Sequence, residues 1–274
     1  MSEPRSLDAH APPSYIRRKA DMNEMDLEGA TALVTGASSG IGESIAVHLA
    51  GSGASVVVHY NSGSERASAL AERLGNGSCA IQADLQDPGR ARSLFRKAVE
   101  RMARIDLLVN NAGIFEPCEP EEGYSSWLRV WERTLAVNLT STGILCREAI
   151  EHFGRFGGGR IVNIASRAAF RGETREYLAY AASKGGMVSL ARSIARSFGK
   201  EGIKAFTIAP GYVRTPMTAE YLDEHGEEMV DRELALDRMT EPGDIAPLVA
   251  FIAAGHLDHA TGTTIDINGG SYIR

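Results

Sequence analysis

The amino-acid sequence predicts an α/β protein built on a doubly wound, seven-stranded parallel sheet flanked by helices. Seven short apolar runs, most of them rich in Val, Ile and Leu, recur along the chain with little polar alternation. Continuous apolar strands are typical of a sheet that is covered on both faces. Stretches with apolar residues at helical spacing separate the runs, and strands that alternate with helices favour parallel pairing.

The expected elements follow from these two patterns in chain order. The apolar runs predict strands at residues 31–35, 55–60, 79–83, 105–110, 160–165, 203–208 and 264–267. Helical spacing predicts helices at residues 41–50, 65–74, 89–102, 127–153, 178–198 and 245–254. No internal repeat interrupts the series, so we expect a single domain over residues 27–274. Residues 1–26 are expected to form a disordered extension, with an oligomer arm as the alternative.

Residues 210–242 break the regular alternation of strands and helices. This segment begins with Pro-Gly, carries several charges and has a weakly helical middle. It follows the carboxyl end of a predicted parallel strand, which is where ligands bind in open α/β sheets. We interpret the segment as a mobile substrate lid, with a solvated surface insertion as the alternative.

Composition limits the classes of partner and compartment. A length of 274 residues suits one large α/β domain, although two small domains would also fit. The net charge is −6 without a Lys/Arg cluster, which argues against nucleic acid as a partner. No apolar run could span a bilayer, and the N-terminus lacks the apolar segment of a secretory signal. The three cysteines have no metal-type spacing, so we expect no metal site and reduced thiols in a cytoplasmic protein.

A glycine-rich turn joins the first expected strand to the first expected helix. It reads Thr35-Gly36-Ala37-Ser38-Ser39-Gly40-Ile41-Gly42. Its glycines allow a tight turn and let backbone N–H groups approach a pyrophosphate, whose charge the helix N-terminus also favours. In this strand–turn–helix context the pattern predicts a Rossmann-type dinucleotide site.

The spacing of these glycines resembles T-G-x-x-x-G-x-G, the fingerprint of the classical short-chain dehydrogenase/reductase family. The other family motifs follow in order, over residues 27–270. They are matched by Asp84-Leu85, Asn110-Asn111-Ala112-Gly113, Asn138, Ser166, Tyr180-Ala181-Ala182-Ser183-Lys184, Pro210-Gly211 and Asn268-Gly269-Gly270. The chain looks most like the β-ketoacyl-carrier-protein reductases and the glucose-dehydrogenase-like members.

Tyr180 and Lys184 are the central pair of the expected chemistry. They lie four apart on an expected helix and therefore share a face, which continues as an apolar stripe. A lysine on an inward face is costly unless it is paired, and the alternative is a lysine whose amine reaches the surface. A nearby ammonium lowers the pKa of a phenol, so we expect Lys184 to prepare Tyr180 as general acid and base.

The resemblance implies roles for further residues of the site. Ser166 would donate a hydrogen bond to the substrate oxygen, and its alternative is a serine that caps a turn. Asn138 would hold a water in a proton relay from Lys184, and its alternative is a core asparagine. The implied cofactor contacts are Gly36, Ser38, Ser39, Gly40, Ile41, Gly42, Tyr60, Asn61, Ser62, Asp84, Leu85, Asn111, Ala112, Gly113, Tyr180, Lys184, Pro210, Gly211, Val213 and Thr215.

The end of the second expected strand bears on the choice between NAD(H) and NADP(H). An acidic residue there would bind the ribose 2′-hydroxyl and repel a 2′-phosphate. This chain instead has Asn61, Ser62 and Ser64, with Arg66 close behind, and no carboxylate at the strand end. We therefore favour NADP(H), while NAD(H) stays open because the usual arginine of the family is missing.

The substrate is expected to be a small carbonyl compound or secondary alcohol. Ser166, Phe170 and Tyr212 are the expected substrate contacts. Further candidates for the pocket wall are Phe115, Arg167, Tyr177 and Met217. The rival tyrosines Tyr124, Tyr177 and Tyr212 have no lysine four residues later and are expected as wall or packing residues.

Two further expectations concern the whole protein. The stretch between Gly113 and Asn138, with four glutamates, is a few residues longer than in typical relatives, so this side of the pocket is expected to differ. The resemblance also implies a homo-oligomer, a dimer or a tetramer, packed through the helices at residues 127–153 and 178–198. The alternative function is a catalytically silent binding or regulatory protein, against which the presence of Ser166, Tyr180 and Lys184 argues.

Overall fold

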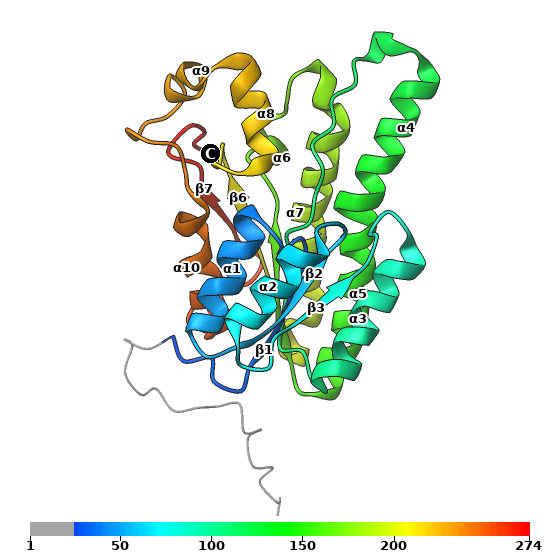
Figure 1. Ribbon diagram of the computed structural model, residues 1–274, viewed down its shortest axis with the longest axis vertical. Helices are drawn as coiled ribbons and strands as arrows, with labels where there is room; N and C mark the ends of the chain where they lie inside the picture. Colours follow the sequence, from blue (N-terminus) through cyan, green and yellow to red (C-terminus); the bar gives the residue numbers. More distant parts are fainter. Residues whose placement is uncertain (1–24) are drawn as a thin grey trace, which may run out of the picture.

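A computed structural model describes residues 25–274 (Figure 1). The expectations for the extension at residues 1–26 therefore fall almost wholly outside the described residues. All seven strands pair in parallel in one sheet of order β3-β2-β1-β4-β5-β6-β7, which confirms the predicted fold class. The strands are β1 (Thr31–Val34), β2 (Ser55–Tyr60), β3 (Cys79–Gln82), β4 (Leu107–Asn110), β5 (Gly159–Ile164), β6 (Ile203–Pro210) and β7 (Thr264–Ile267).

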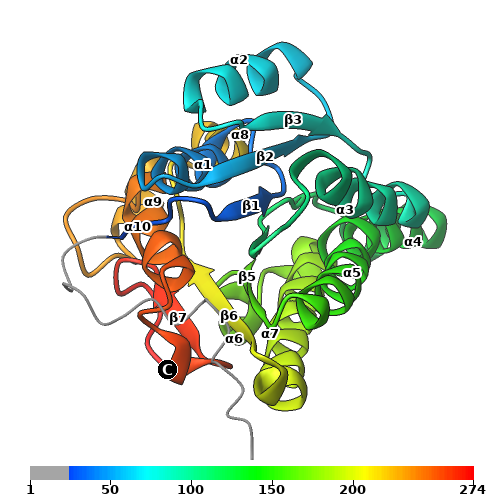
Figure 2. The same ribbon diagram turned by 90° about the horizontal axis from the view of Figure 1, so that it is seen from below.

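Helices cover both faces of the sheet (Figure 2). On one face α1 (Gly40–Gly51), α2 (Ser64–Leu74) and α10 (Pro242–Ala253) pack over a core that includes Val34, Val56 and Val58. On the other face α3 (Pro88–Met102), α5 (Ser141–Arg155) and α7 (Leu178–Phe198) pack over a core that includes Leu33 and Val57. Successive residues of a strand point to opposite faces, so two apolar faces require the continuous apolar runs seen in the sequence.

The helix expected at residues 127–153 is longer than predicted and is not uniform. It runs as α4 (Tyr124–Leu135), a π-helical turn at Ala136–Thr140, and then α5. Two hydroxyls bond carbonyls at this turn: Ser141 Oγ donates to Val137 O at 2.6 Å, and Thr142 Oγ1 to Asn138 O at 2.9 Å. The wider turn surrounds the buried Asn138, and π-turns of this kind are frequent at functional sites.

The strand order reverses between β1 and β4, which are neighbours in the sheet although two strands separate them in sequence. Ligands of doubly wound sheets bind in the crevice at such a switch point, outside the carboxyl ends of the strands. The glycine-rich turn after β1 and the Asn111-Ala112-Gly113 segment after β4 therefore meet at one edge of the sheet. Short helices complete this edge: α6 (Ala168–Arg171) after β5, and α8 (Pro216–His225) and α9 (Glu227–Asp231) after β6.

Residues 210–242 lie at the carboxyl-end edge of the sheet, as predicted, with α8 and α9 near the C-terminus (Figure 1). They hold a small apolar cluster of their own, formed by Leu222, Val230 and Met239. An isolated bridge between Val213 and Thr240 closes the base of the segment. The segment is therefore packed rather than merely solvated, and its closing over a substrate stays a prediction. Over residues 25–274, the structure contains no helix that is both long and apolar enough to cross a membrane.

Candidate active site

The turn after β1 has a backbone conformation and close contacts that favour glycine. Gly36 and Gly40 have φ of 61° and 58°, in the left-handed region. A Cβ atom on Gly42 would lie 2.3 Å from the Gly36 carbonyl oxygen and 2.5 Å from Nδ2 of Asn111. The turn is thus drawn closely onto the start of α1, where the N–H groups of a helix N-terminus suit a phosphate.

Side chains from β1 and from the segment after β4 hold this turn in place. Thr35 Oγ1 accepts the N–H groups of Asn111 at 2.9 Å and Ala112 at 3.0 Å. In return, Asn111 Nδ2 donates to the carbonyls of Thr35 at 2.9 Å and Gly36 at 3.1 Å. The two motifs therefore form one hydrogen-bonded unit rather than two separate loops.

His59 is a structural member of the site that the sequence analysis missed. Its Nδ1 accepts the N–H of Gly36 at 3.0 Å, and its Nε2 then donates to the carbonyl of Ala83 at 3.0 Å. Burial lowers the pKa of His59 to about 4, so the ring is neutral at working pH and can accept at Nδ1. A histidine inside the otherwise apolar run Val56-Val57-Val58 was the available signal.

The end of β2 presents the expected polar residues to solvent. Gln82 Nε2 donates to the Asn61 carbonyl at 3.2 Å and lies 3.5 Å from its Oδ1, so β3 orients Asn61. The guanidinium of Arg66 folds back onto the loop, since a Cβ atom on Gly63 would lie 3.1 Å from its Nη2. Asn61, Ser62 and Arg66 therefore all lie just beyond Tyr60. The single carboxylate among residues 60–66 is that of Glu65, on the first turn of α2.

The other expected cofactor contacts lie around the same crevice. Asp84 Oδ1 accepts the N–H of Gln86 at 3.0 Å, which fixes the turn after β3, and Leu85 beside it is buried. Thr215 precedes α8, and a Cβ atom on Gly40 would lie 3.3 Å from its Cγ2. The remaining expected contacts lie on the turn before α1 and at the start of that helix, in the segment after β4, or at the end of β6 and just beyond it. They are Ser38, Ser39, Ile41, Ala112, Gly113, Pro210, Gly211 and Val213.

The structure brings Ser166, Tyr180 and Lys184 together. Ser166 follows β5, and its side chain is near enough to Tyr180 on α7 to lower the pKa of the Tyr180 hydroxyl. Its Oγ also accepts the N–H of Ala168 at 3.1 Å, so it caps a turn as well. Lys184, one helical turn beyond Tyr180, is buried and donates from Nζ to the Ile164 carbonyl at 2.9 Å.

The pKa of Tyr180 differs from the expectation. Burial of the hydroxyl raises the pKa of Tyr180 to about 12. The Ser166 side chain acts in the opposite direction and lowers the pKa, while the negative charge of Glu173 also raises it. The expected net lowering of this pKa is therefore wrong: burial of the hydroxyl outweighs the other influences on it, and the Lys184 amine, 5.6 Å from the Tyr180 ring centroid, donates to the Ile164 carbonyl. Burial in turn lowers the pKa of Lys184 to about 8.

Asn138 lies beside this group at the π-turn. Its Oδ1 accepts the N–H of Ile114 at 2.8 Å, while its Nδ2 donates to the Ile114 carbonyl at 3.0 Å and to Ser183 Oγ at 3.1 Å. Both Asn138 Oδ1 and Lys184 Nζ border Gly113, at 3.3 and 3.4 Å from the position of a Cβ atom there. Asn138 therefore ties the segment after β4 to α7 through direct bonds, and its role in a water relay stays a prediction.

The aromatic candidates divide into wall and surface residues. Phe115 stacks on Tyr177 at 3.7 Å between centroids and meets Tyr180 edge-on at 4.7 Å, so it supports the catalytic ring. Tyr212 lies under the guanidinium of Arg167, at 4.4 Å. Phe170 on α6 is covered by Arg274, whose guanidinium lies 3.7 Å from its ring centroid. Met217 is half exposed on α8.

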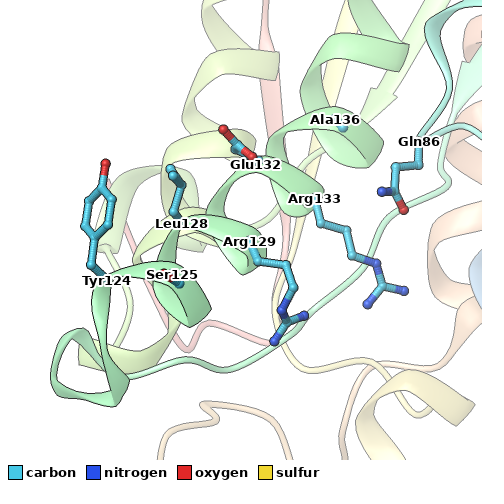
Figure 3. Close-up of a pocket in the computed structure, with 8 residues that line it drawn as sticks. All are labelled: Gln86, Tyr124, Ser125, Leu128, Arg129, Glu132, Arg133 and Ala136. Carbon is cyan, nitrogen blue, oxygen red and sulfur yellow. The ribbon is translucent and has the colours of Figure 1, made fainter.

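Tyr124 lies away from this group, on the outer side of α4. It lines a surface hollow with Leu128, Arg129, Arg133 and Gln86 among others, and none of the catalytic candidates borders that hollow (Figure 3). The glutamates of the longer stretch serve local structure. Glu116 pairs with Arg133 at 2.7 Å, and Glu119 and Glu122 form a capping box around the 3₁₀ turn Pro120–Glu122.

Comparison with known proteins gives consistent matches. A family described as enoyl-(acyl carrier protein) reductase matches residues 36–272. A 3-oxoacyl-(acyl-carrier-protein) reductase of Staphylococcus aureus is 34% identical over 89% of this chain and 98% of its own length. L-rhamnose 1-dehydrogenase (NAD(P)(+)) of a Sphingomonas species is 35% identical over 90% of this chain and 98% of its own length. The solved structure of a putative 2-deoxy-D-gluconate 3-dehydrogenase from Agrobacterium tumefaciens, with bound NADP, superposes with a TM-score of 0.81. Its sequence is 31% identical, and the match covers 91% of this chain and 98% of that one.

Proposed function

The chain belongs to the classical short-chain dehydrogenase/reductase family of NAD(P)-dependent oxidoreductases, and from this premise we propose a specific reaction and specific roles for its residues. The reaction is hydride transfer between NADP(H) and a carbonyl compound or secondary alcohol, with Tyr180 as general acid and base. The proposal is carried by the gathering of Ser166, Tyr180 and Lys184 at the carboxyl ends of the strands, beside the switch point of the sheet.

The crevice suits a dinucleotide. The absent Cβ atoms of Gly36 and Gly42 leave the turn tight against Ala112 and Asn111, with backbone N–H groups at the N-terminus of α1 available for a pyrophosphate. When bound, the reduced nicotinamide supplies the hydride. Lys184 and Tyr180 border the segment after β4 and would hold the ribose side of that ring.

Different residues would transfer the proton and stabilise the developing charge. In the reducing direction the carbonyl carbon gains the hydride, and its oxygen gains the proton of the Tyr180 hydroxyl. Ser166 donates a hydrogen bond to the same oxygen and stabilises the charge that develops there. A pKa near 12 keeps Tyr180 protonated, and a protonated Lys184 favours the phenolate that remains after transfer. Alcohol oxidation reverses each step.

Wild-type turnover tests the reaction. A panel of ketones, aldehydes and secondary alcohols is assayed with each cofactor, and (4-²H)NADPH is used with any ketone that reacts. We expect deuterium from one face of the nicotinamide to appear on the carbinol carbon of the product. The absence of turnover across the panel, or label lost to water, would contradict direct hydride transfer.

We also propose that the enzyme prefers NADP(H) over NAD(H). A 2′-phosphate would meet Asn61, Ser62 and the guanidinium of Arg66 at the end of β2, with no strand-end carboxylate to repel it. Charge-assisted hydrogen bonds contribute about 1.5–3 kcal/mol each, although exposure reduces the share of Arg66. One such bond is enough for a preference of about tenfold.

Fluorescence titration with NADPH and NADH tests this preference. We expect wild type to bind NADPH at least tenfold more tightly, and Asn61→Asp to weaken NADPH far more than NADH. Equal affinities in wild type would contradict the preference. An Asn61→Asp variant that binds NADPH normally would show that another residue selects the cofactor.

We propose, finally, that the enzyme works in the cytoplasm as a dimer or tetramer. The three cysteines, Cys79, Cys118 and Cys146, are all free, as is usual in a reducing compartment. Helix α4 carries the exposed Tyr124 and the half-buried, stacked pair Trp127 and Trp131, and it belongs to the helix pair expected to pack against another copy. Sedimentation equilibrium should give two or four times the chain mass of 29.4 kDa, and a monomer at micromolar concentration would contradict this.

A further inference from the structure

Arg167 is a buried cation next to the proposed catalytic serine. It follows Ser166 directly, and its N–H donates to the Pro210 carbonyl at 2.8 Å. Only 2% of the residue is exposed. Arginine is almost never buried to this extent without full pairing, so its partners require an explanation.

The guanidinium of Arg167 is only partly satisfied. Nη2 lies 2.7 Å from Oε2 of Glu233, and the ring of Tyr212 lies beneath the group at 4.4 Å. Nη1 is buried and has no hydrogen-bond acceptor among the residues that the structure describes. A buried donor of this kind is unfavourable in the folded protein, which suggests that its partner arrives from outside the chain.

The carboxylate of Glu233 marks a position at which the two arginines bind a carboxylate. Its Oε2 is shared by Arg167 and by Nη1 of Arg171, at 2.7 and 3.0 Å. Two guanidinium groups that converge on one carboxylate oxygen form the arrangement that proteins use for anions. Glu233 lies beyond α9 in the 210–242 segment and is about one-third exposed, so it belongs to the part of the site that borders solvent.

The charges of the cluster favour an anion once Glu233 is displaced. Arg171 also faces Glu173, 3.6 Å away, whose pKa is raised by burial. Arg167 and Arg171 together outweigh Glu173 alone, so the cluster without Glu233 is cationic. Arg167 directly follows Ser166 in the chain and lies over the ring of Tyr212, an expected substrate contact, so the cluster borders the proposed substrate pocket.

We propose that Arg167 is a specificity-determining residue that binds the carboxylate of an oxo-acid or hydroxy-acid substrate in the place that Glu233 occupies. The inference rests on the proposed function and adds the substrate class to it. The substrate would be held at its carbonyl by Ser166 and Tyr180, and at its acid group by Arg167 with Arg171. Glu233 would be exchanged for the substrate carboxylate as the 210–242 segment adjusts.

Matched acids and esters test the proposal with the full-length enzyme and NADPH. The pairs are acetoacetate, 4-oxopentanoate and 5-oxohexanoate, each beside its methyl ester, so that the acid group lies at three distances from the carbonyl. We expect kcat/KM for the best acid to exceed that of its ester at least tenfold. Arg167→Gln should abolish this preference by lowering kcat/KM for the acid at least tenfold, while an unchanged far-UV circular dichroism spectrum and NADPH dissociation constant show that the variant is folded.

Two further variants separate a carboxylate site from a purely structural ion pair. Glu233→Gln leaves Arg167 in place and removes its competitor, so KM for the acid should fall at least threefold while that for the ester stays unchanged. Arg214→Gln is the matched control. It breaks the exposed pair of Arg214 with Glu227 in the same segment and should leave the acid-to-ester ratio unchanged.

Esters that react as well as the acids in all three pairs would overturn the inference and leave the proposed function intact. The same holds if Glu233→Gln weakens the acid and the ester equally, since Glu233 would then only fasten the segment. If neither member of any pair reacts, and the carbonyl panel gives no turnover either, the proposed function fails with it.

Discussion

At the scale of single residues, the proposed site consists of polar groups that are costly to bury. Lys184 is the clearest example: its amine is enclosed and bonds one carbonyl, that of Ile164. Burial lowers its pKa from 10.5 to about 8, which means that the folded chain holds the ammonium less favourably than water does. Such a residue is retained for chemistry rather than for stability.

We therefore predict that Lys184→Met stabilises the fold near neutral pH. The difference between 10.5 and about 8 corresponds to about 3 kcal/mol, from which the lost hydrogen bond to Ile164 takes about 1 kcal/mol. Urea unfolding at pH 7 should give a gain of about 2 kcal/mol in the free energy of unfolding, together with loss of turnover.

The sign of the pH dependence provides the check on this prediction. The folded pKa lies below the unfolded one, so the destabilisation by Lys184 is complete below pH 8 and disappears as the pH rises toward 10.5. Wild type should therefore gain stability relative to Lys184→Met between these pH values. A gap between the two proteins that stays constant from pH 7 to pH 10 would contradict the assigned cause.

At the scale of elements, the turn between β1 and α1 depends on two glycines and on the groups that hold them. The Gly36 carbonyl and Asn111 Nδ2 occupy the space beside Gly42, and both are fixed by hydrogen bonds to one another. A methyl group there must displace backbone that forms the phosphate cradle.

We predict that Gly42→Ala weakens NADPH binding at least tenfold in a fluorescence titration. Gly51→Ala, in the same helix, is the matched control, because a Cβ atom at Gly51 meets nothing within 4 Å. Alanine there should leave the affinity unchanged and stabilise the helix by up to about 1 kcal/mol. Normal binding by Gly42→Ala would show that the turn is looser than described.

The elements also show where sequence patterns stop being informative. Helical spacing predicts one helix through residues 127–153, and the chain does run on as helix there. The π-turn at Ala136–Thr140 is not visible in that spacing, since one wide turn shifts the apolar stripe by a single residue. Asn138 could be placed on the helix from its motif, but its bonds to Ile114 and Ser183 depend on this turn.

At the scale of the whole molecule, the part of the site that could be predicted is the part that the parallel sheet brings together. Gly36, Asn111, Ser166 and Gly211 each follow the carboxyl end of a strand, and those ends share one edge. A parallel sheet alone therefore brings the motifs together.

Contacts between distant segments could not be predicted in the same way. Arg167 meets Glu233, and Phe170 is covered by Arg274, through side-chain geometry that no local spacing encodes. His59 supports the glycine-rich turn from the neighbouring strand, and its role depends on the register of β1 and β2. The expected direction of the Tyr180 pKa was wrong because burial, its largest cause, depends on how distant segments enclose the hydroxyl.

The central claim is that Tyr180 exchanges the proton while the rest of the crevice binds the cofactor. The most direct test is Tyr180→Phe, which removes one hydroxyl and keeps the ring against Phe115. Steady-state kinetics with NADPH and a ketone that the wild type reduces should show a fall in kcat of at least a hundredfold, with the NADPH dissociation constant within about threefold of wild type. Retention of more than about a tenth of kcat, a loss of under about 1.4 kcal/mol, would contradict the account.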